Sequence, residues 1–169
     1  MRDAFGGSFM IKLLLVFIII YVGFTAIALN YAKAFKVKNK IIEYLEDNEI
    51  TDINELTSRE YDRMNEFFET EILGKMNYQI GNIECSVPKG YDPDDVEPYC
   101  PPDIGIKIVK IHPKESKKNK DGDYFQVYTY FGWEIPFINS ILNLSGRNGT
   151  VVGGRWEIVG ETRTIVNEW

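Results

Sequence analysis

Few side chains in this chain could carry out covalent or metal chemistry. The 169 residues include one histidine, His112, and two cysteines, Cys85 and Cys100. These cannot supply a Cys₄ or Cys₂His₂ zinc cluster or a His₃ site, and a Ser-His-Asp or Cys-His catalytic site would have to use His112. Because His112 has no second histidine and no nearby cysteine, we expect it to be a structural or surface residue. The sequence predicts no enzyme, no metal and no cofactor.

One acidic segment could offer oxygen atoms to a hard cation such as Ca²⁺. It contains Asp92, Asp94, Asp95 and Glu97. The spacing lacks the form of an EF-hand loop, so a solvated acidic loop is favoured over a calcium site.

Cys85 and Cys100 bracket fourteen residues that include three prolines and a glycine, and two more prolines follow. Such a loop cannot build its own core, and a disulfide closing it would contribute about 3 kcal/mol through loop-closure entropy. Two free buried thiols are the alternative. We expect the disulfide, and because disulfides persist outside the cytosol, it favours an extracytoplasmic location for this part of the chain.

Charge is divided unevenly along the chain. Residues 1–40 carry six Lys and Arg against one Asp, and residues 41–169 carry thirteen against twenty-four Asp and Glu. An acidic body repels a polyanion, so nucleic-acid binding is not expected.

Seventeen uncharged residues from Leu13 to Leu29 predict a membrane anchor. A helix of that length covers about 26 Å, the short end of the transmembrane range, and Lys12 can snorkel to extend it. A cleaved secretory signal and a buried core helix are the alternatives, and Ala26-Ile27-Ala28 resembles the cleavage site of a signal. However, apolar residues continue at helical spacing beyond the span, which favours one helix of about forty residues ending near Asn48.

The orientation of this anchor rests on two opposing signals. Four lysines between residues 33 and 40 outweigh Arg2 and Lys12, which on its own would place the C-terminal part in the cytoplasm. We give more weight to the predicted disulfide. The prediction is a single-pass membrane protein whose C-terminal domain is extracytoplasmic.

The rest of the chain predicts an α+β domain. Thr57-Ser58-Arg59-Glu60 has the form of a capping box and begins a second, amphipathic helix that ends near residue 75. Beyond residue 77 the period of apolar residues changes to two, which indicates five or six short strands, and without intervening helices these form an antiparallel sheet. We expect strands at Tyr78–Ile80, at Ile104–Val109, around Phe125–Thr129, at Val151-Val152, at Trp156–Ile158 and at Thr162–Ile165.

We therefore expect the chain to be organised in three regions. Residues 1–29 form a leader-like segment and a transmembrane helix, residues 30–77 a helical stalk and amphipathic helix, and residues 78–169 an antiparallel β-domain with the Cys-bracketed loop.

The layout resembles that of type IV pilins and pseudopilins. It consists of an N-terminal MRDAFGG, an apolar helix that continues beyond the membrane, and a small disulfide-tied β-domain. The resemblance implies a processing site at Gly6, Gly7 and Ser8, with peptidase cleavage after Gly7. The family carries a glutamate at the fifth position of the mature helix, where this chain has Lys12, a charge of the opposite sign.

A second likeness lies in the C-terminal half. Residues 124–136, YFQVYTYFGWEIP, followed by Gly160-Glu161-Thr162-Arg163, are similar to a pattern of TadE-like pilus assembly proteins, which are minor pseudopilins. This implies a structural or priming subunit of a pilus or secretion apparatus whose partners are membrane lipid and other pilin-like subunits or the assembly platform.

The small residues Gly23 and Ala26, together with Lys12, would form the assembly surface of the helix. A membrane-tethered extracytoplasmic binding module with no pilus role is the alternative, and a membrane-bound enzyme is the least favoured class.

Overall fold

The computed structural model describes residues 2–112, 122–134 and 153–163. The chain divides into two compact units. One comprises Met1–Ala32 with Gly132–Gly154, and the other Lys33–Phe131 with Arg155–Trp169. The described elements are α1 (Arg2–Asp47), α2 (Ser58–Phe67), the π-helix η1 (Phe68–Lys75), the 3₁₀ turn η2 (Pro93–Asp95) and the strands β1 (Val96–Tyr99), β2 (Ile106–Ile111), β3 (Tyr124–Glu134) and β4 (Gly153–Glu161).

The long N-terminal helix predicted from the sequence is confirmed, and it begins already at Arg2. It contains no proline, the residue that would interrupt its backbone hydrogen bonds. It ends in a Schellman motif. The Ile50 N–H donates to the Leu45 carbonyl at 3.1 Å and the Glu49 N–H to the Glu46 carbonyl at 3.2 Å. The left-handed residue is Glu49, with φ of 49°, which follows Asn48, the residue near which the sequence predicts the end of the helix.

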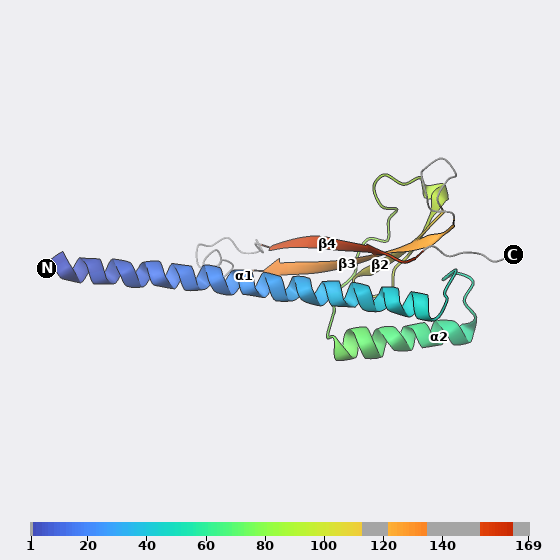
Figure 1. Cartoon of the computed structure of the whole chain (residues 1–169), viewed down its shortest axis with the longest axis horizontal. Helices are drawn as coiled ribbons and strands as arrows, with labels where there is room; N and C mark the ends of the chain where they lie inside the picture. The colour runs from blue at the N-terminus through green and yellow to red at the C-terminus, as the bar shows by residue number, and fades with distance from the viewer. Residues whose placement is uncertain (1, 113–121, 135–152, 164–169) are drawn as a thin grey trace. The chain divides into compact units, whose positions relative to one another are not determined.

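The second helix begins at the predicted capping residues. The Glu60 carboxylate reaches back and accepts hydrogen bonds from the Thr57 N–H at 2.9 Å and from the Thr57 hydroxyl at 2.6 Å. Helical structure continues through η1 to Lys75, as the sequence predicts. α2 runs alongside the C-terminal part of α1 (Figure 1), where the Tyr44 and Phe67 rings stack with centroids 4.1 Å apart.

The strands form one sheet in the order β1-β2-β3-β4. β1 pairs with β2, and β2 with β3, in antiparallel register. At the other side of β3, the Thr162 N–H just after β4 donates to the Phe125 carbonyl near the start of β3, and the Thr129 hydroxyl reaches the carbonyl of Ile158. From the first pairing to the second, the residue number rises along β3 and falls along β4. β4 is therefore also antiparallel to β3. The predicted α+β class is confirmed.

The positions of some of the described strands differ from the prediction. Tyr78–Ile80 is not a strand, although the Ile80 N–H donates one hydrogen bond to the Ile104 carbonyl at 3.2 Å. β1 lies inside the Cys-bracketed loop, where the sequence predicted no strand. It forms because an edge strand needs backbone partners on one side only, which tolerates Pro98. The predicted strand at Val151-Val152 lies outside the described residues. Of the predicted strand at Thr162–Ile165, Thr162 and Arg163 follow the end of β4 and are not strand, and the other two residues lie outside the described part of the chain.

Alternate residues of β3 face two different cores. Phe125, Val127 and Thr129 face α1, and the Thr129 hydroxyl donates to the Ala34 carbonyl at 3.1 Å. On this side the residues of α1 that are buried follow helical spacing, namely Ala34, Val37, Lys38, Ile41 and Leu45. Tyr124 and Tyr128 face the other way and form a second core with Val96, Val109 and Ile111. The sheet is therefore buried on both faces, by helices on one and by the Cys-bracketed loop on the other.

Candidate functional site

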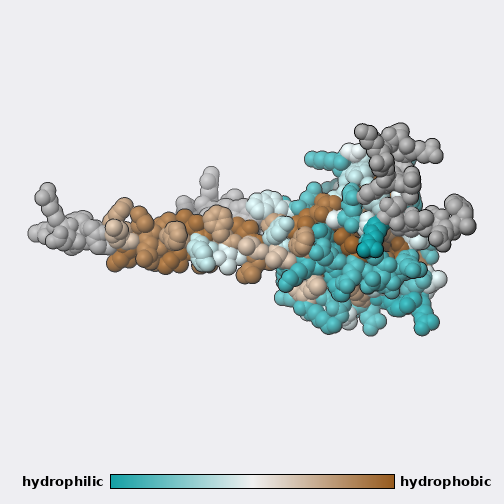
Figure 2. Space-filling view, viewed as in Figure 1, coloured by the Kyte–Doolittle hydropathy of each residue, from teal (hydrophilic) through white to brown (hydrophobic). Residues whose placement is uncertain are grey.

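Between residues 9 and 32, α1 is exposed except at Gly23 and Ile27, which are half-buried. Its large apolar residues include Phe9 at 65% exposed, Phe17 at 67% and Phe24 at 67%. Figure 2 shows hydrophobic residues gathered along this part of the helix, whereas hydrophilic residues cover much of the visible surface of the other unit. Among the described residues, one helix, Phe9–Asp47, is long and apolar enough to cross a membrane. An N-terminal anchor and a signal sequence both have this composition.

The predicted assembly residues all lie on α1. Lys12 and Ala26 are exposed, Gly23 is half-buried, and the space where a Gly23 side chain would project holds no atom within 4 Å. The hydroxyl of Thr25 donates to the carbonyl of Tyr21 at 2.9 Å, so the segment satisfies this polar group internally. Gly6, Gly7 and Ser8, the predicted processing site, also lie within α1.

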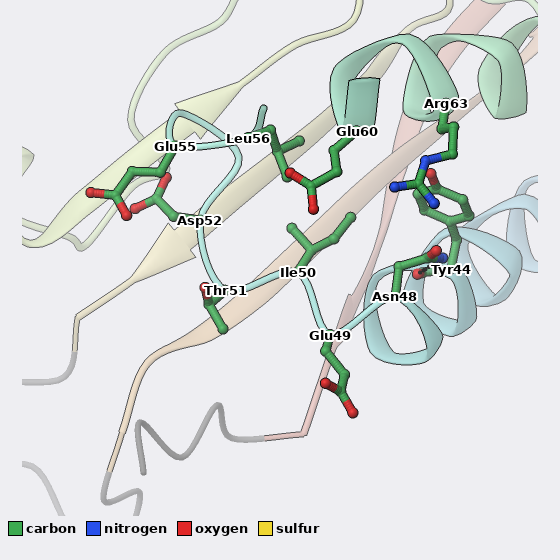
Figure 3. A pocket seen from close by; sticks show the side chains of 10 residues that line it. All are labelled: Tyr44, Asn48, Glu49, Ile50, Thr51, Asp52, Glu55, Leu56, Glu60 and Arg63. Carbon is green, nitrogen blue, oxygen red and sulfur yellow. Dashed lines mark hydrogen bonds between the residues drawn. The ribbon is translucent and has the colours of Figure 1, made fainter. Parts of the chain in front are cut away.

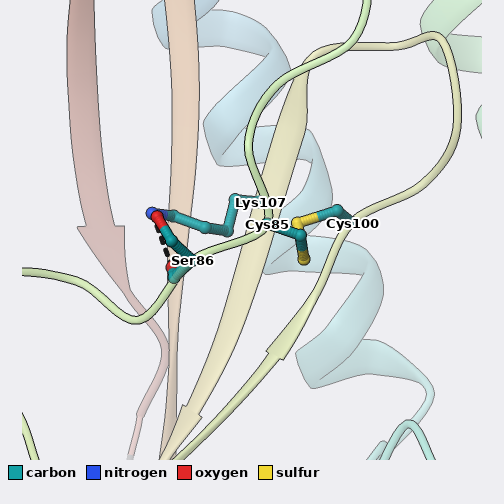
Figure 4. The surroundings of a disulfide bond; sticks show 4 residues. All are labelled: Cys85, Ser86, Cys100 and Lys107. Carbon is teal, nitrogen blue, oxygen red and sulfur yellow. Dashed lines mark hydrogen bonds between the residues drawn. A yellow bond between two sulfur atoms is a disulfide. The ribbon is translucent and has the colours of Figure 1, made fainter. Parts of the chain in front are cut away.

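The structure joins Cys85 to Cys100 by a disulfide, as the sequence predicts, with the two Cα atoms 5.9 Å apart. Beside it, the Lys107 ammonium donates to the Ser86 carbonyl at 3.3 Å (Figure 4). Val87 and Tyr91, which lie within the bracketed loop, pack against the second core of the sheet. The disulfide therefore closes a loop that covers one face of the sheet.

The acidic residues of this loop do not converge on a cation site. The Asp92 carboxylate accepts from the Asp94 N–H at the start of η2. Glu97 turns toward Asn54, whose amide donates to its carboxylate at 3.0 Å. In residues 2–112, 122–134 and 153–163, no three His, Cys, Asp or Glu side chains are grouped so that they could hold a metal ion.

His112 belongs to a charged network that sequence analysis did not predict. Its Nδ1 lies 3.0 Å from Asp123 Oδ1, and its Nε2 lies 3.8 Å from Glu97 Oε1. The neighbouring Lys110 ammonium lies 2.6 Å from Asp52 Oδ2 and 3.7 Å from Asp123 Oδ2. This network connects the segment between α1 and α2 to the sheet. The available signal was Lys110, which is one of two lysines in the otherwise apolar strand β2.

The pairing shifts the pKa values of both partners. Burial alone would raise the pKa of Asp52, but hydrogen bonds from Lys110 and from backbone N–H groups, together with the charge of Lys110, hold it below 3.8. Burial would lower the pKa of Lys110, but Asp52, Asp123 and Glu97 raise it above 10.5. Both groups are therefore ionised at neutral pH, and the network is a fixed electrostatic contact.

A small pocket of about 260 Å³ lies between the end of α1 and the start of α2 (Figure 3). Glu49, Asp52, Glu55 and Glu60 contribute carboxylates and Arg63 a guanidinium. Asp52 and Glu60 are engaged by Lys110 and Thr57. Four carboxylates of the same charge therefore line the pocket, and two of them already accept hydrogen bonds from the protein. We assign the pocket no ligand.

We compared the chain with protein-family models, with curated proteins and with solved structures, and none of them matches.

Proposed function

We propose that this chain is a membrane-anchored, pilin-like (TadE-like) structural or priming subunit of a pilus or secretion apparatus. The observation that carries the proposal is the part of α1 between residues 9 and 32, where the large apolar side chains are exposed apart from the half-buried Ile27. Such a surface is unfavourable in water and needs lipid or other apolar helices around it. In pilin-like subunits, one helix of this kind is surrounded first by lipid and then by other apolar helices.

Three residues of this helix support assembly over simple anchoring. Gly23 and Ala26 present small side chains on which a neighbouring helix can pack closely. Lys12 places one positive charge in the apolar segment, and among packed helices such a charge requires a carboxylate from a neighbour. The proposed partners are therefore membrane lipid, other pilin-like subunits and the assembly platform.

The remaining domain fits a structural role on the outer side of the membrane. Its disulfide supports an extracytoplasmic location. Its single histidine, His112, lies between the carboxylates of Asp123 and Glu97 in a charged network. We propose no catalytic activity for the chain.

The first test is the mass of the protein isolated from its native membrane. Cleavage after Gly7 would leave Ser8 as the new N-terminus, and we expect this mature form. An intact N-terminus would contradict pilin-like processing, and cleavage near Ala28 would indicate a secretory signal instead.

The second test replaces Lys12 by Leu. We expect the variant to insert into the membrane as the parent does, since a more apolar segment inserts at least as well. We also expect it to lose co-purification with pilus or pseudopilus components, because the charge pair with a neighbouring subunit is absent. Immunoprecipitation from detergent extracts measures both properties.

Lys36→Leu is the matched control, because Lys36 is an exposed lysine of α1 that lies beyond the apolar span. It should co-purify like the parent. If Lys12→Leu also assembles like the parent, Lys12 is only an interfacial anchor, and a tethered binding module becomes the better hypothesis.

A further inference from the structure

A groove of about 560 Å³ lies between residues 83–89 and the sheet face that the Cys-bracketed loop covers. Its volume is within the range of about 300–1,000 Å³ that is typical of small-ligand sites. The disulfide at Cys85 ties the loop wall of this groove to Cys100. The groove therefore has one wall from a sheet and one from a covalently restrained segment.

Lys107 is a buried cation that lines this groove. It is 6% exposed, its ammonium donates to the Ser86 carbonyl at 3.3 Å, and the ammonium lies 4.7 Å from the centroid of the Tyr128 ring. In the described part of the chain, no carboxylate oxygen lies within 4.0 Å of its nitrogen. An ammonium has three donors, and one long hydrogen bond leaves it poorly compensated for the water it has lost.

The surroundings of Lys107 favour a monoanion with an apolar body. Lys89 and Arg155 add two positive charges to the lining, and Glu84 and Glu157 add two exposed negative ones. The groove therefore has a net charge of about +1, and its two carboxylates repel a doubly charged anion such as phosphate. Rings of Tyr128 and Tyr130, with Val87 and Val159, provide the apolar surface for the rest of a ligand.

We propose that this groove binds a carboxylate, which pairs with the Lys107 ammonium while an aromatic or aliphatic body packs on Tyr128 and Tyr130. The carboxylate belongs either to a small organic acid or to the C-terminus of a peptide. The site does not depend on the pilin-like role, because all its residues belong to the domain that contains the sheet.

The test is a ligand-observed NMR titration of the full chain in detergent micelles, with protein-free micelles as a blank. The probes are phenylacetate, for a small organic acid, and N-acetyl-Ala-Ala-Phe, for a peptide C-terminus. Phenylacetamide and the amidated peptide serve as uncharged controls, and inorganic phosphate tests the preference for a monoanion. We expect at least one carboxylate to bind at least about tenfold more tightly than its amide and than phosphate, since a charged hydrogen bond is lost in the amide.

Lys107→Met keeps the length of the side chain and removes its charge, and we expect it to weaken carboxylate binding by about tenfold. Lys75→Met is the control at an exposed lysine outside the groove and should bind as the parent does. Equal binding of carboxylate and amide by the parent protein, binding of neither carboxylate, or tighter binding of phosphate would each overturn the proposal. The comparison of probes on the parent protein decides it even if Lys107→Met does not fold.

Discussion

Tyr78 closes the end of the sheet with a single hydroxyl group. β3 extends beyond the end of β2, and there the Tyr78 hydroxyl accepts from the Tyr130 N–H at 2.8 Å and donates to the Tyr130 carbonyl at 2.6 Å. Burial is the main reason that the pKa of Tyr78 is raised to about 12. One side chain thus replaces the backbone partners that a longer strand would have supplied.

We predict that Tyr78→Phe destabilises the protein by about 2 kcal/mol, because both backbone groups of Tyr130 lose their partner while partly buried. Thermal unfolding followed by circular dichroism measures the change. Tyr44→Phe is the matched control. It keeps the ring that stacks on Phe67, and it should change the unfolding free energy by less than about 0.5 kcal/mol. Equal effects of the two variants would show that the Tyr78 hydroxyl does not support the sheet.

The Asp52–Lys110 pair predicts how stability depends on acid. The pKa of Asp52 is lower in the folded state than in the unfolded state. The ionised carboxylate therefore contributes its full stabilisation of the fold above about pH 4, and this contribution is lost as the pH falls through the folded-state pKa. Asp52→Asn should therefore reduce stability at neutral pH by about 2 kcal/mol and have a much smaller effect near pH 2. Melting temperatures measured across this pH range give the result.

Asp62→Asn makes the same substitution at an exposed residue of α2 and should leave the pH profile unchanged. If Asp52→Asn reduces stability equally at pH 2 and pH 7, the contribution of Asp52 is not that of an ionised carboxylate.

At the scale of elements, the Cys-bracketed loop depends on its disulfide. The loop covers one face of the sheet, includes the edge strand β1, and packs Val87 and Tyr91 on the second core. Its two ends lie 15 residues apart in sequence. The disulfide therefore reduces the conformational freedom of the unfolded chain, and it also keeps the loop packed on apolar residues of the sheet.

We predict that replacing both Cys85 and Cys100 by Ser destabilises the protein by about 3 kcal/mol, mainly because the unfolded loop gains freedom. Reduction of the parent protein should produce a similar decrease in melting temperature, and reduction of the double variant should produce none. If the parent melts at the same temperature before and after complete reduction, the disulfide does not stabilise this domain.

At the scale of the whole molecule, one helix takes part in both compact units. Between residues 9 and 32 its apolar side chains are exposed apart from the half-buried Ile27, whereas from Ala34 onward one face is buried against the sheet. An amphipathic helix normally has one apolar face, so the change along α1 indicates a change of surroundings. This change supports the proposal of a membrane anchor continuous with a domain outside the membrane.

Local patterns in the sequence determined the long helix, the start of the second helix and the disulfide. Each depends on short-range physics. An uninterrupted apolar run without proline forms a helix, Thr57 and Glu60 meet because they are three residues apart, and two cysteines at the ends of a poorly packed loop can close it. The same patterns failed at Tyr78–Ile80, where alternation of apolar residues indicated a strand. In the structure this segment is not a strand, and the Tyr78 hydroxyl instead pairs with the backbone N–H and carbonyl of Tyr130 in β3.

Only the tertiary structure decided which distant residues meet. Lys110 and Asp52 are 58 residues apart, and Tyr78 and Tyr130 are 52 apart. Lys107 lies in a groove because the loop from Cys85 folds over its strand. No periodicity of the chain encodes such pairs, since they depend on strand register and on the path of a loop, and both are chosen by the burial of many side chains at once.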